Sequence, residues 1–143
     1  MQRLVYISGS SVNLTDVGSA ASDFASWAQI KNRPSGVSGA LIFTDKIFAQ
    51  VLEGNHADIE AMLALIESDK HHENVVVIDK SPISQRVFAD WQIAYQGSSQ
   101  YVSRHLAGWM NAPSCLERQR ASAWITVAAS EFLAIRAESN QIV

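Results

Sequence analysis

The chain of 143 residues lacks most features of secreted and membrane proteins. Its single cysteine, Cys115, excludes an internal disulfide and is typical of a protein from a reducing compartment. No segment approaches the roughly 18 consecutive apolar residues that span a bilayer. The apolar run at residues 4–7 is also too short for the core of a signal peptide. We therefore expect a cytoplasmic protein that does not act at a membrane.

Charged residues are few, at 17 %, and nearly balanced, because 11 Lys and Arg stand against 14 Asp and Glu. A nucleic-acid-binding protein carries a basic patch, so no nucleic-acid partner is expected. The adjacent His71 and His72 have no cysteine or third histidine at zinc-binding spacing, so no metal site is expected and a solvated helix end is the simpler interpretation. With three Pro, seven Gly and 48 % hydrophobic residues, the composition excludes disorder and favours one globular domain with a small appendage.

Apolar runs and helical spacings predict alternating strands and helices up to residue 96. A helix is expected between Thr15 and Pro34, and a second one from Asn55, which with Asp58 resembles a capping box, to about Asp69. The expected strands lie at residues 4–8, 36–43, 47–52, 75–78 and 88–95. The order βαββαββ predicts an α+β sandwich of ferredoxin-like type, with a mixed sheet and both helices on one face.

Beyond Gln96 the pattern indicates a C-terminal helical extension. A linker is followed by a modest helical signal over residues 101–110 and by a longer helix over about residues 116–137. We therefore divide the chain into a sandwich domain, residues 1–96, and an extension, residues 97–143. The longer helix carries a stripe that either packs on the free face of the sheet or pairs with another subunit. The stripe comprises Leu116, Arg120, Ala123, Trp124, Val127, Ala128 and Ile135.

Two polar residues stand inside apolar strands. Tyr6 requires a partner for its hydroxyl if its ring is buried. Gln50 points with Phe48 and Leu52 by strand alternation, and a buried amide can donate and accept at once. An exposed sheet face is the simpler interpretation for Gln50. Glu53 and Gly54 are interpreted as a turn, so the residues alone indicate an α+β domain with a polar site between its helices.

Several motifs occur in a fixed order between residues 3 and 95, and together they resemble the BLUF domain, a flavin-binding blue-light sensor. The most specific of them is the block Phe-x-Gln-x-Leu-Glu-Gly. The motifs are Leu4-Val5-Tyr6-Ile7-Ser8, Asn32, Gly36-Val37-Ser38-Gly39-Ala40-Leu41, Phe48-Ala49-Gln50-Val51-Leu52-Glu53-Gly54, Asp69, His72 and Arg86-x-Phe88-x-x-Trp91.

The resemblance implies that FAD lies between the two helices, over the sheet. It implies that Tyr6 hydrogen-bonds Gln50, that Gln50 contacts the N5 and O4 edge of the flavin, and that Asn32 and Asp69 also bind the ring. Blue light then drives electron and proton transfer from Tyr6 to the flavin. Recombination leaves Gln50 in a changed tautomer or orientation with a stronger bond to O4, seen as a small red shift. The signal leaves through Trp91 and the residue at position 93.

The chain departs from the family pattern at three positions. Ile93 stands where methionine is usual, His71 replaces a common arginine, and Leu65 replaces a polar or basic residue that faces the O2 edge of the ring. Lys31, Arg33 and Lys70 are the candidates for the FAD phosphates, and we include His71 among the flavin-binding candidates.

The expected function is that of a non-enzymatic photoreceptor. Because the 47 residues after Gln96 leave no room for an output enzyme domain, we expect the extension to form a homo-oligomer or to bind a downstream protein in trans. One alternative is a ferredoxin-like interaction module that has lost photochemistry, against which the presence of both Tyr6 and Gln50 argues. A flavin-dependent oxidoreductase is a further alternative, for which the sequence offers no residues of a hydride-donor site.

Overall fold

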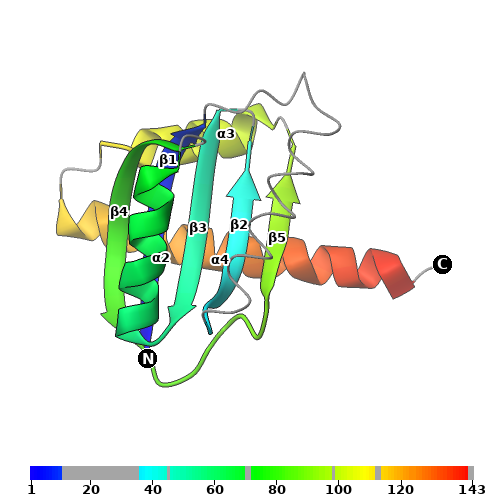
Figure 1. Ribbon diagram of the computed structural model, residues 1–143. Helices are drawn as coiled ribbons and strands as arrows, with labels where there is room; N and C mark the ends of the chain where they lie inside the picture. The colour runs from blue at the N-terminus through cyan, green and yellow to red at the C-terminus, as the bar shows by residue number, and fades with distance from the viewer. Residues whose placement is uncertain (11–35, 45, 70–71, 98, 112–113, 142–143) are drawn as a thin grey trace.

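The computed structural model describes residues 1–10, 36–44, 46–69, 72–97, 99–111 and 114–141 (Figure 1). The helix predicted between Thr15 and Pro34 lies outside these ranges. The strands are β1 (Gln2–Ser10), β2 (Ser38–Phe43), β3 (Ile47–Gly54), β4 (His72–Pro82) and β5 (Trp91–Gln96). The helices are α2 (His56–Ser68), α3 (Gln100–Trp109) and α4 (Cys115–Gln141).

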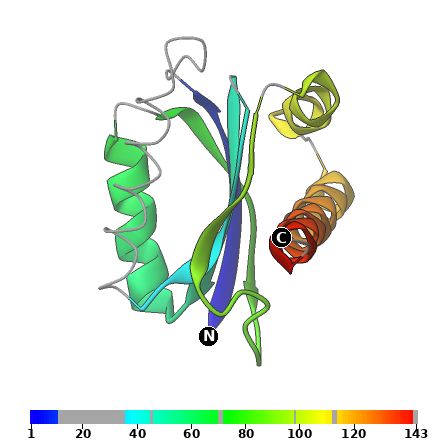
Figure 2. The same cartoon turned by 90° about the vertical axis from the view of Figure 1, so that its right-hand side faces the viewer.

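The five strands form one mixed sheet in the order β4-β1-β3-β2-β5. β1 is antiparallel to both β3 and β4, β2 is antiparallel to β3, and β2 is parallel to β5. Figure 2 shows the sheet between α2 on one face and α3 and α4 on the other. Because both faces are covered, β2 and β3 are buried along their whole length, which explains their unbroken apolar runs. The predicted ferredoxin-like architecture is confirmed.

Each face of the sheet has its own hydrophobic core. On the α2 side, Leu4 and Leu52 of the sheet pack with all four helix residues that the spacing singled out, Ile59, Met62, Leu63 and Ile66. On the other side, alternate strand residues such as Val5 and Val51 pack with α3 and α4. The C-terminal extension therefore shares a core with the sheet, while the boundary at residue 96 remains a prediction.

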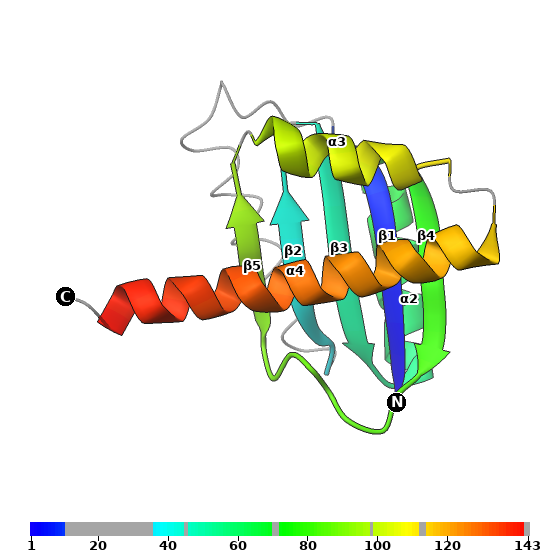
Figure 3. The same ribbon diagram turned by 180° about the vertical axis from the view of Figure 1, so that it is seen from behind.

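Most of the predicted stripe of α4 does not pack on the sheet. The helix crosses the strands (Figure 3) and contacts them through Ala121, Ile125 and Ala129, which are fully buried. Ala121 and Ala129 are small and let the helix backbone approach the sheet closely. Of the predicted stripe, only Trp124 and Ala128 pack against this core, and both are partly buried. Leu116 and Val127 are therefore 56 % and 55 % exposed. The helix covers the sheet, as one alternative proposed, and leaves the other stripe uncovered.

Local signals located the start of each described helix to within one residue, although α4 continues to Gln141, beyond the predicted end. Asn55 is the N-cap residue of α2, but its side chain makes no capping hydrogen bond, so the predicted capping box does not form. Ser99 and Ser114 do cap α3 and α4, because their hydroxyl oxygens accept from Val102 N at 3.2 Å and Glu117 N at 3.1 Å. Asp69 ends α2 as predicted.

Two charged residues hold the connection between β4 and β5. Glu53 is fully buried within β3, not in a turn, and its carboxylate accepts from Arg3 Nη2 at 2.7 Å and Phe88 N at 2.8 Å. Arg86 donates to Ser38 Oγ at 2.6 Å and to the Glu53 carbonyl oxygen at 2.8 Å. The Glu53 carboxylate thus links β1 to the connection, and Arg86 links the connection to β2 and to the backbone of β3.

Gly39 sets the distance between β2 and β3. A Cβ atom at this position would lie 1.8 Å from the carbonyl oxygen of Val51, so only glycine permits this approach.

Within the described residues, no helix is long and apolar enough to cross a membrane. The same part of the chain holds no group of three or more side chains that could bind a metal.

Candidate functional site

Tyr6 and Gln50 form a buried hydrogen-bonded pair on the α2 face of the sheet. They are direct partners in the antiparallel pairing of β1 with β3, so their side chains project to the same face. The Tyr6 hydroxyl donates to Gln50 Oε1. Tyr6 is fully buried and Gln50 is 5 % exposed, so the exposed position considered for Gln50 is wrong. In such a dry environment a hydrogen bond is electrostatically strong.

The surroundings keep Tyr6 protonated. Burial of the ring raises the pKa of the phenol far above its ordinary value, and the negative charge of Asp69 raises this pKa further. Simple loss of a proton is therefore unfavourable at any physiological pH. A proton leaves this phenol readily only when an electron leaves with it, because the product is then neutral.

His72 is part of the same site. As the first residue of β4, it places Nδ1 2.8 Å from the hydroxyl oxygen of the buried Ser8. The imidazole packs against Phe48, with ring centroids 4.5 Å apart, and lies at the edge of Tyr6, with centroids 5.9 Å apart. The interpretation of His72 as a solvated helix end is wrong, because the strand begins at this residue. Its role as a partner of Ser8 could not be inferred from the pattern of β4.

A row of cross-strand partners extends from the pair to β5. Gln50 is opposite Leu41 of β2, and Leu41 is opposite Ile93 of β5. Trp91 lies two residues before Ile93 on the same strand and is opposite Gly39. The strand alternation therefore places the side chains of Tyr6, Gln50 and Ile93 on one face.

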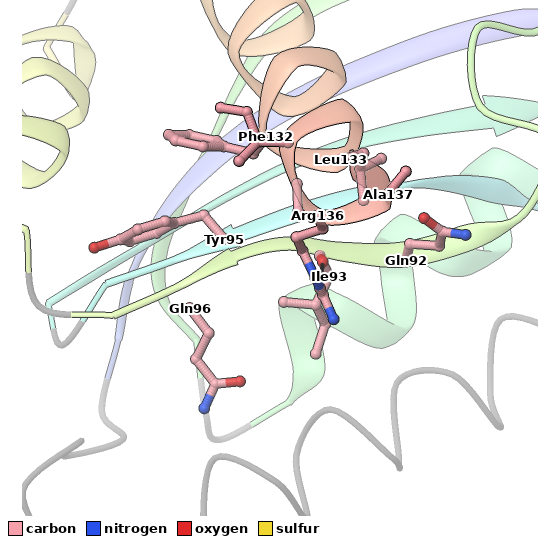
Figure 4. A pocket seen from close by; sticks show the side chains of 10 residues that line it. Gln92, Ile93, Tyr95, Gln96, Phe132, Leu133, Arg136 and Ala137 are labelled. Carbon is pink, nitrogen blue, oxygen red and sulfur yellow. Dashed lines mark hydrogen bonds between the residues drawn. The ribbon is translucent and has the colours of Figure 1, made fainter. Parts of the chain in front are cut away.

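At Ile93 the row reaches α4. The β2–β5 register shifts after Leu41, which indicates a bulge in β5 next to Ile93. The guanidinium of Arg136 donates to the carbonyl oxygen of Ile93. Figure 4 shows the Arg136 side chain reaching from the helix toward Ile93. Residues of α4 and β5 line a hollow of about 840 Å³ at this place. The last strand is thus attached to the helix on the far side of the sheet.

The structure brings together five of the predicted site residues. Tyr6, Gln50, Trp91 and Ile93 share one face of the sheet, and Asp69 lies at the end of α2 near Tyr6. The remaining predicted ligands lie outside the described residues. They are Lys31, Asn32, Arg33, Lys70 and His71.

The polar atoms on this face suit a flavin ring. Among the described residues, Gln50 Nε2 donates to no group. Trp91 is 7 % exposed, and its Nε1 also has no hydrogen-bond partner in that part of the chain. The isoalloxazine edge offers carbonyl oxygens and ring nitrogens that accept hydrogen bonds, and its flat apolar body suits the surrounding side chains. The site therefore offers unused donors of the kind that a flavin requires.

Fold and site together define a ferredoxin-like domain with a buried phenol–amide pair. The family model described as "BLUF: Sensors of blue-light using FAD" matches residues 1–94. The chain belongs to this family of blue-light sensors. The predicted photoreceptor class is thereby confirmed, and the ferredoxin-like interaction module is not supported.

Two relatives are subunits of photoactivated adenylate cyclases. Over 93 residues, or 65 % of this chain, it is 33 % identical to photoactivated adenylate cyclase subunit beta and 31 % identical to subunit alpha, both of Euglena gracilis. The match covers 11 % and 9 % of those subunits. The chain thus spans about a tenth of the length of these relatives.

Solved structures show the same fold. BlrP1 of Klebsiella pneumoniae, solved with FMN and cyclic diGMP, is 30 % identical, with a TM-score of 0.57 over 64 % of this chain and 25 % of that one. BlsA in its photo-activated state is 20 % identical, with a TM-score of 0.67 over 90 % of this chain and 94 % of that one. The likeness to BlsA concerns the fold and includes most of the C-terminal extension.

Proposed function

We propose that this chain senses blue light through FAD held non-covalently, with Tyr6 as electron and proton donor and Gln50 as the switching group. The observation that carries the proposal is the hydrogen bond from the Tyr6 hydroxyl to Gln50 Oε1, made where both residues are buried. A bound flavin supplies absorption in the blue and an excited state that accepts one electron.

The two side chains then act in sequence. Tyr6 gives up an electron, and the proton of its hydroxyl moves along the existing hydrogen bond to Gln50. When electron and proton return to Tyr6, the Gln50 amide remains in a changed tautomer or orientation, because its donor and acceptor ends can be exchanged. No net oxidation results, and the altered hydrogen bond of Gln50 is the signal.

The remaining flavin contacts are also proposals. Asp69 and Asn32 bind the ring edge, and Lys31, Lys70 and His71 are candidates for contacts with the rest of the cofactor. Asp69 is supported by its place at the end of α2, next to the phenol.

The cofactor can be identified directly. We expect the purified protein to be yellow and to release its flavin on heating, because the proposed site makes no covalent bond to the ring. Chromatography of the supernatant against FAD and FMN standards should give FAD. A supernatant that contains only FMN would contradict FAD as the native cofactor, and a colourless protein that takes up neither flavin would contradict the binding proposal.

The signal is proposed to travel along the row to Ile93, with Trp91 beside it, and from there to α4. Leu41 connects Gln50 to Ile93 across the sheet, and Arg136 connects the Ile93 carbonyl to the helix. A change at Gln50 can therefore alter the hydrogen bond between Arg136 of α4 and the Ile93 carbonyl of β5, although α4 does not contact the flavin.

Two variants test this route. Ile93→Met, which replaces a stiff β-branched side chain by a flexible thioether, should change the lifetime of the lit state while the dark spectrum stays as it is. Arg136→Gln should change dark recovery by up to about fivefold, since one hydrogen bond contributes roughly 1 kcal/mol. Flash photolysis measures both, with Arg104→Gln on the exposed side of α3 as the matched control. A dark spectrum shifted as far as the light-induced one would contradict the placement of Ile93 on the relay.

We propose that the chain is a sensor and not itself an enzyme, that it forms a homo-oligomer, and that it passes its signal to a downstream protein in trans. The exposed surface of the extension supports such contacts, because large apolar side chains in a contiguous row are normally covered by a partner. A cytoplasmic location remains part of the proposal.

A further inference from the structure

The outer side of α4 carries an exposed row of apolar residues. Leu116, Val127 and Ile135 are each more than half exposed, and Trp124 is half-buried at the middle of the row. A shallow groove of about 610 Å³ follows this side of the helix and is bordered by Tyr101 of α3. Figure 3 shows α4 crossing the face of the sheet opposite α2.

Two opposite charges belong to the same groove. Arg120 and Glu131 both line it, 11 residues apart, which is about three helical turns. Neither residue forms an ion pair with another described residue. The positive charge lies on the N-terminal half of α4 and the negative charge on the C-terminal half, so the groove has opposite signs at its two ends.

The positions of these residues are symmetric about one point, between Ile125 and Thr126. Arg120 and Glu131 lie at equal distances from it along the chain, as do Trp124 and Val127. Leu116 and Ile135, near the ends of the groove, are related in the same way. An antiparallel copy of the helix, turned about a two-fold axis through this point, would place each residue opposite its counterpart.

We infer that the outer face of α4 binds a second copy of this chain, with the two α4 helices antiparallel. A two-fold interface uses the same patch on both subunits. In this register each Arg120 faces the second copy's Glu131, so two ion pairs flank a centre of Trp124 against Val127. A parallel pairing would instead oppose Arg120 to Arg120 and Glu131 to Glu131. The charges therefore select a second copy in one orientation.

The outer face of α4 would thus be the interface of the homo-oligomer in the proposed function, on which this inference rests. About 20 residues of helix span roughly 30 Å. A strip of this length and one helix diameter wide, about 10 Å, covers roughly 300 Å². This is less than a standard interface of about 800 Å² per partner. We expect a reversible dimer whose population rises with protein concentration.

Sedimentation velocity over a range of concentrations tests the orientation. Arg120→Glu and Glu131→Arg should each weaken the dimer at least tenfold, because each opposes like charges twice in the symmetric interface. The double variant Arg120→Glu/Glu131→Arg should restore it, since the pairs are re-formed with their signs exchanged. Glu67→Arg, an exposed charge reversal on α2 across the sheet, is the control and should leave the dimer unchanged.

A wild-type protein that stays monomeric at all concentrations would overturn the inference, and so would a double variant no stronger than the single ones. All of these substitutions are at exposed positions, and circular dichroism should confirm that each variant folds. The light-induced spectral shift, measured on the same samples, should persist in every variant, because Arg120 and Glu131 lie across the sheet from Tyr6. Loss of the dimer with an intact shift refutes only the interface, whereas a wild type without a shift refutes the photochemical proposal.

Discussion

Tyr6→Phe is expected to abolish the light-induced red shift while the protein still binds its flavin. Phenylalanine preserves the volume of a ring that is fully buried, so the core around Leu4 and Leu52 should remain packed. What is lost is the hydroxyl that donates to Gln50 Oε1. Without it, no other group among the described residues of this face supplies an electron together with a proton that already points at the amide.

The cost in stability should be small compared with the loss of function. Removal of one buried hydrogen bond lowers the free energy of unfolding by about 1 kcal/mol. Trp91 lies on the same face and can donate an electron, but its indole makes no hydrogen bond to Gln50 among the described contacts. It therefore cannot replace Tyr6 as the proton donor.

The measurement is a difference spectrum before and after blue light. Tyr95→Phe is the matched control. The Tyr95 hydroxyl also takes part in a hydrogen bond, because it accepts from Ser99 N at 3.1 Å. The Tyr95 ring, however, packs with the core on the α4 side of the sheet. The control should keep the wild-type shift. A stable shift of wild-type size in Tyr6→Phe would show that Tyr6 is only a core residue.

Glu53→Gln is expected to lower the free energy of unfolding by about 3 kcal/mol, the cost of breaking a buried ion pair. The carboxylate is fully buried and accepts from Arg3 Nε at 3.1 Å and Nη2 at 2.7 Å. It also accepts from the backbone N–H groups of Val87 and Phe88, at 2.9 Å and 2.8 Å. Glutamine has the same shape, but it turns an NH₂ group toward these donors and removes the charge opposite Arg3.

Denaturant unfolding followed by circular dichroism measures the effect. Glu60→Gln is the control, because the side chains of the Lys80–Glu60 ion pair, at 2.8 Å, are 40 % and 39 % exposed. Loss of such a surface pair should change the midpoint very little. Equal midpoints for Glu53→Gln and the wild type would show that the buried carboxylate does not hold the connection between β4 and β5.

Much of the fold could be predicted because its signals are local. The apolar runs of β2 and β3 and the spacing of Ile59, Met62, Leu63 and Ile66 depend only on neighbouring residues. The extent of β4 could not be predicted, because several of its residues are exposed at the edge of the sheet and polar residues are tolerated there. His72 was misplaced for the same reason.

The orientation of α4 shows where a local pattern is insufficient. Its sequence holds two usable stripes, one with Leu116, Val127 and Ile135 and one with Ala121, Ile125 and Ala129. The larger side chains favour the first when hydrophobicity alone is counted. The second is buried, because Ala121 and Ala129 let the helix lie closely on the sheet and Ile125 between them fills the core.

The sequence by itself determined the strand and helix pattern, the family, and the presence of a phenol and an amide in apolar strands. The tertiary structure decided that these two groups meet. Tyr6 and Gln50 are 44 residues apart, and only the register of β1 against β3 sets them opposite each other on one face. It also decided that Glu53 is buried and that Arg136 reaches Ile93. Such contacts depend on which distant segments pack together, and a pattern of neighbouring residues does not specify that.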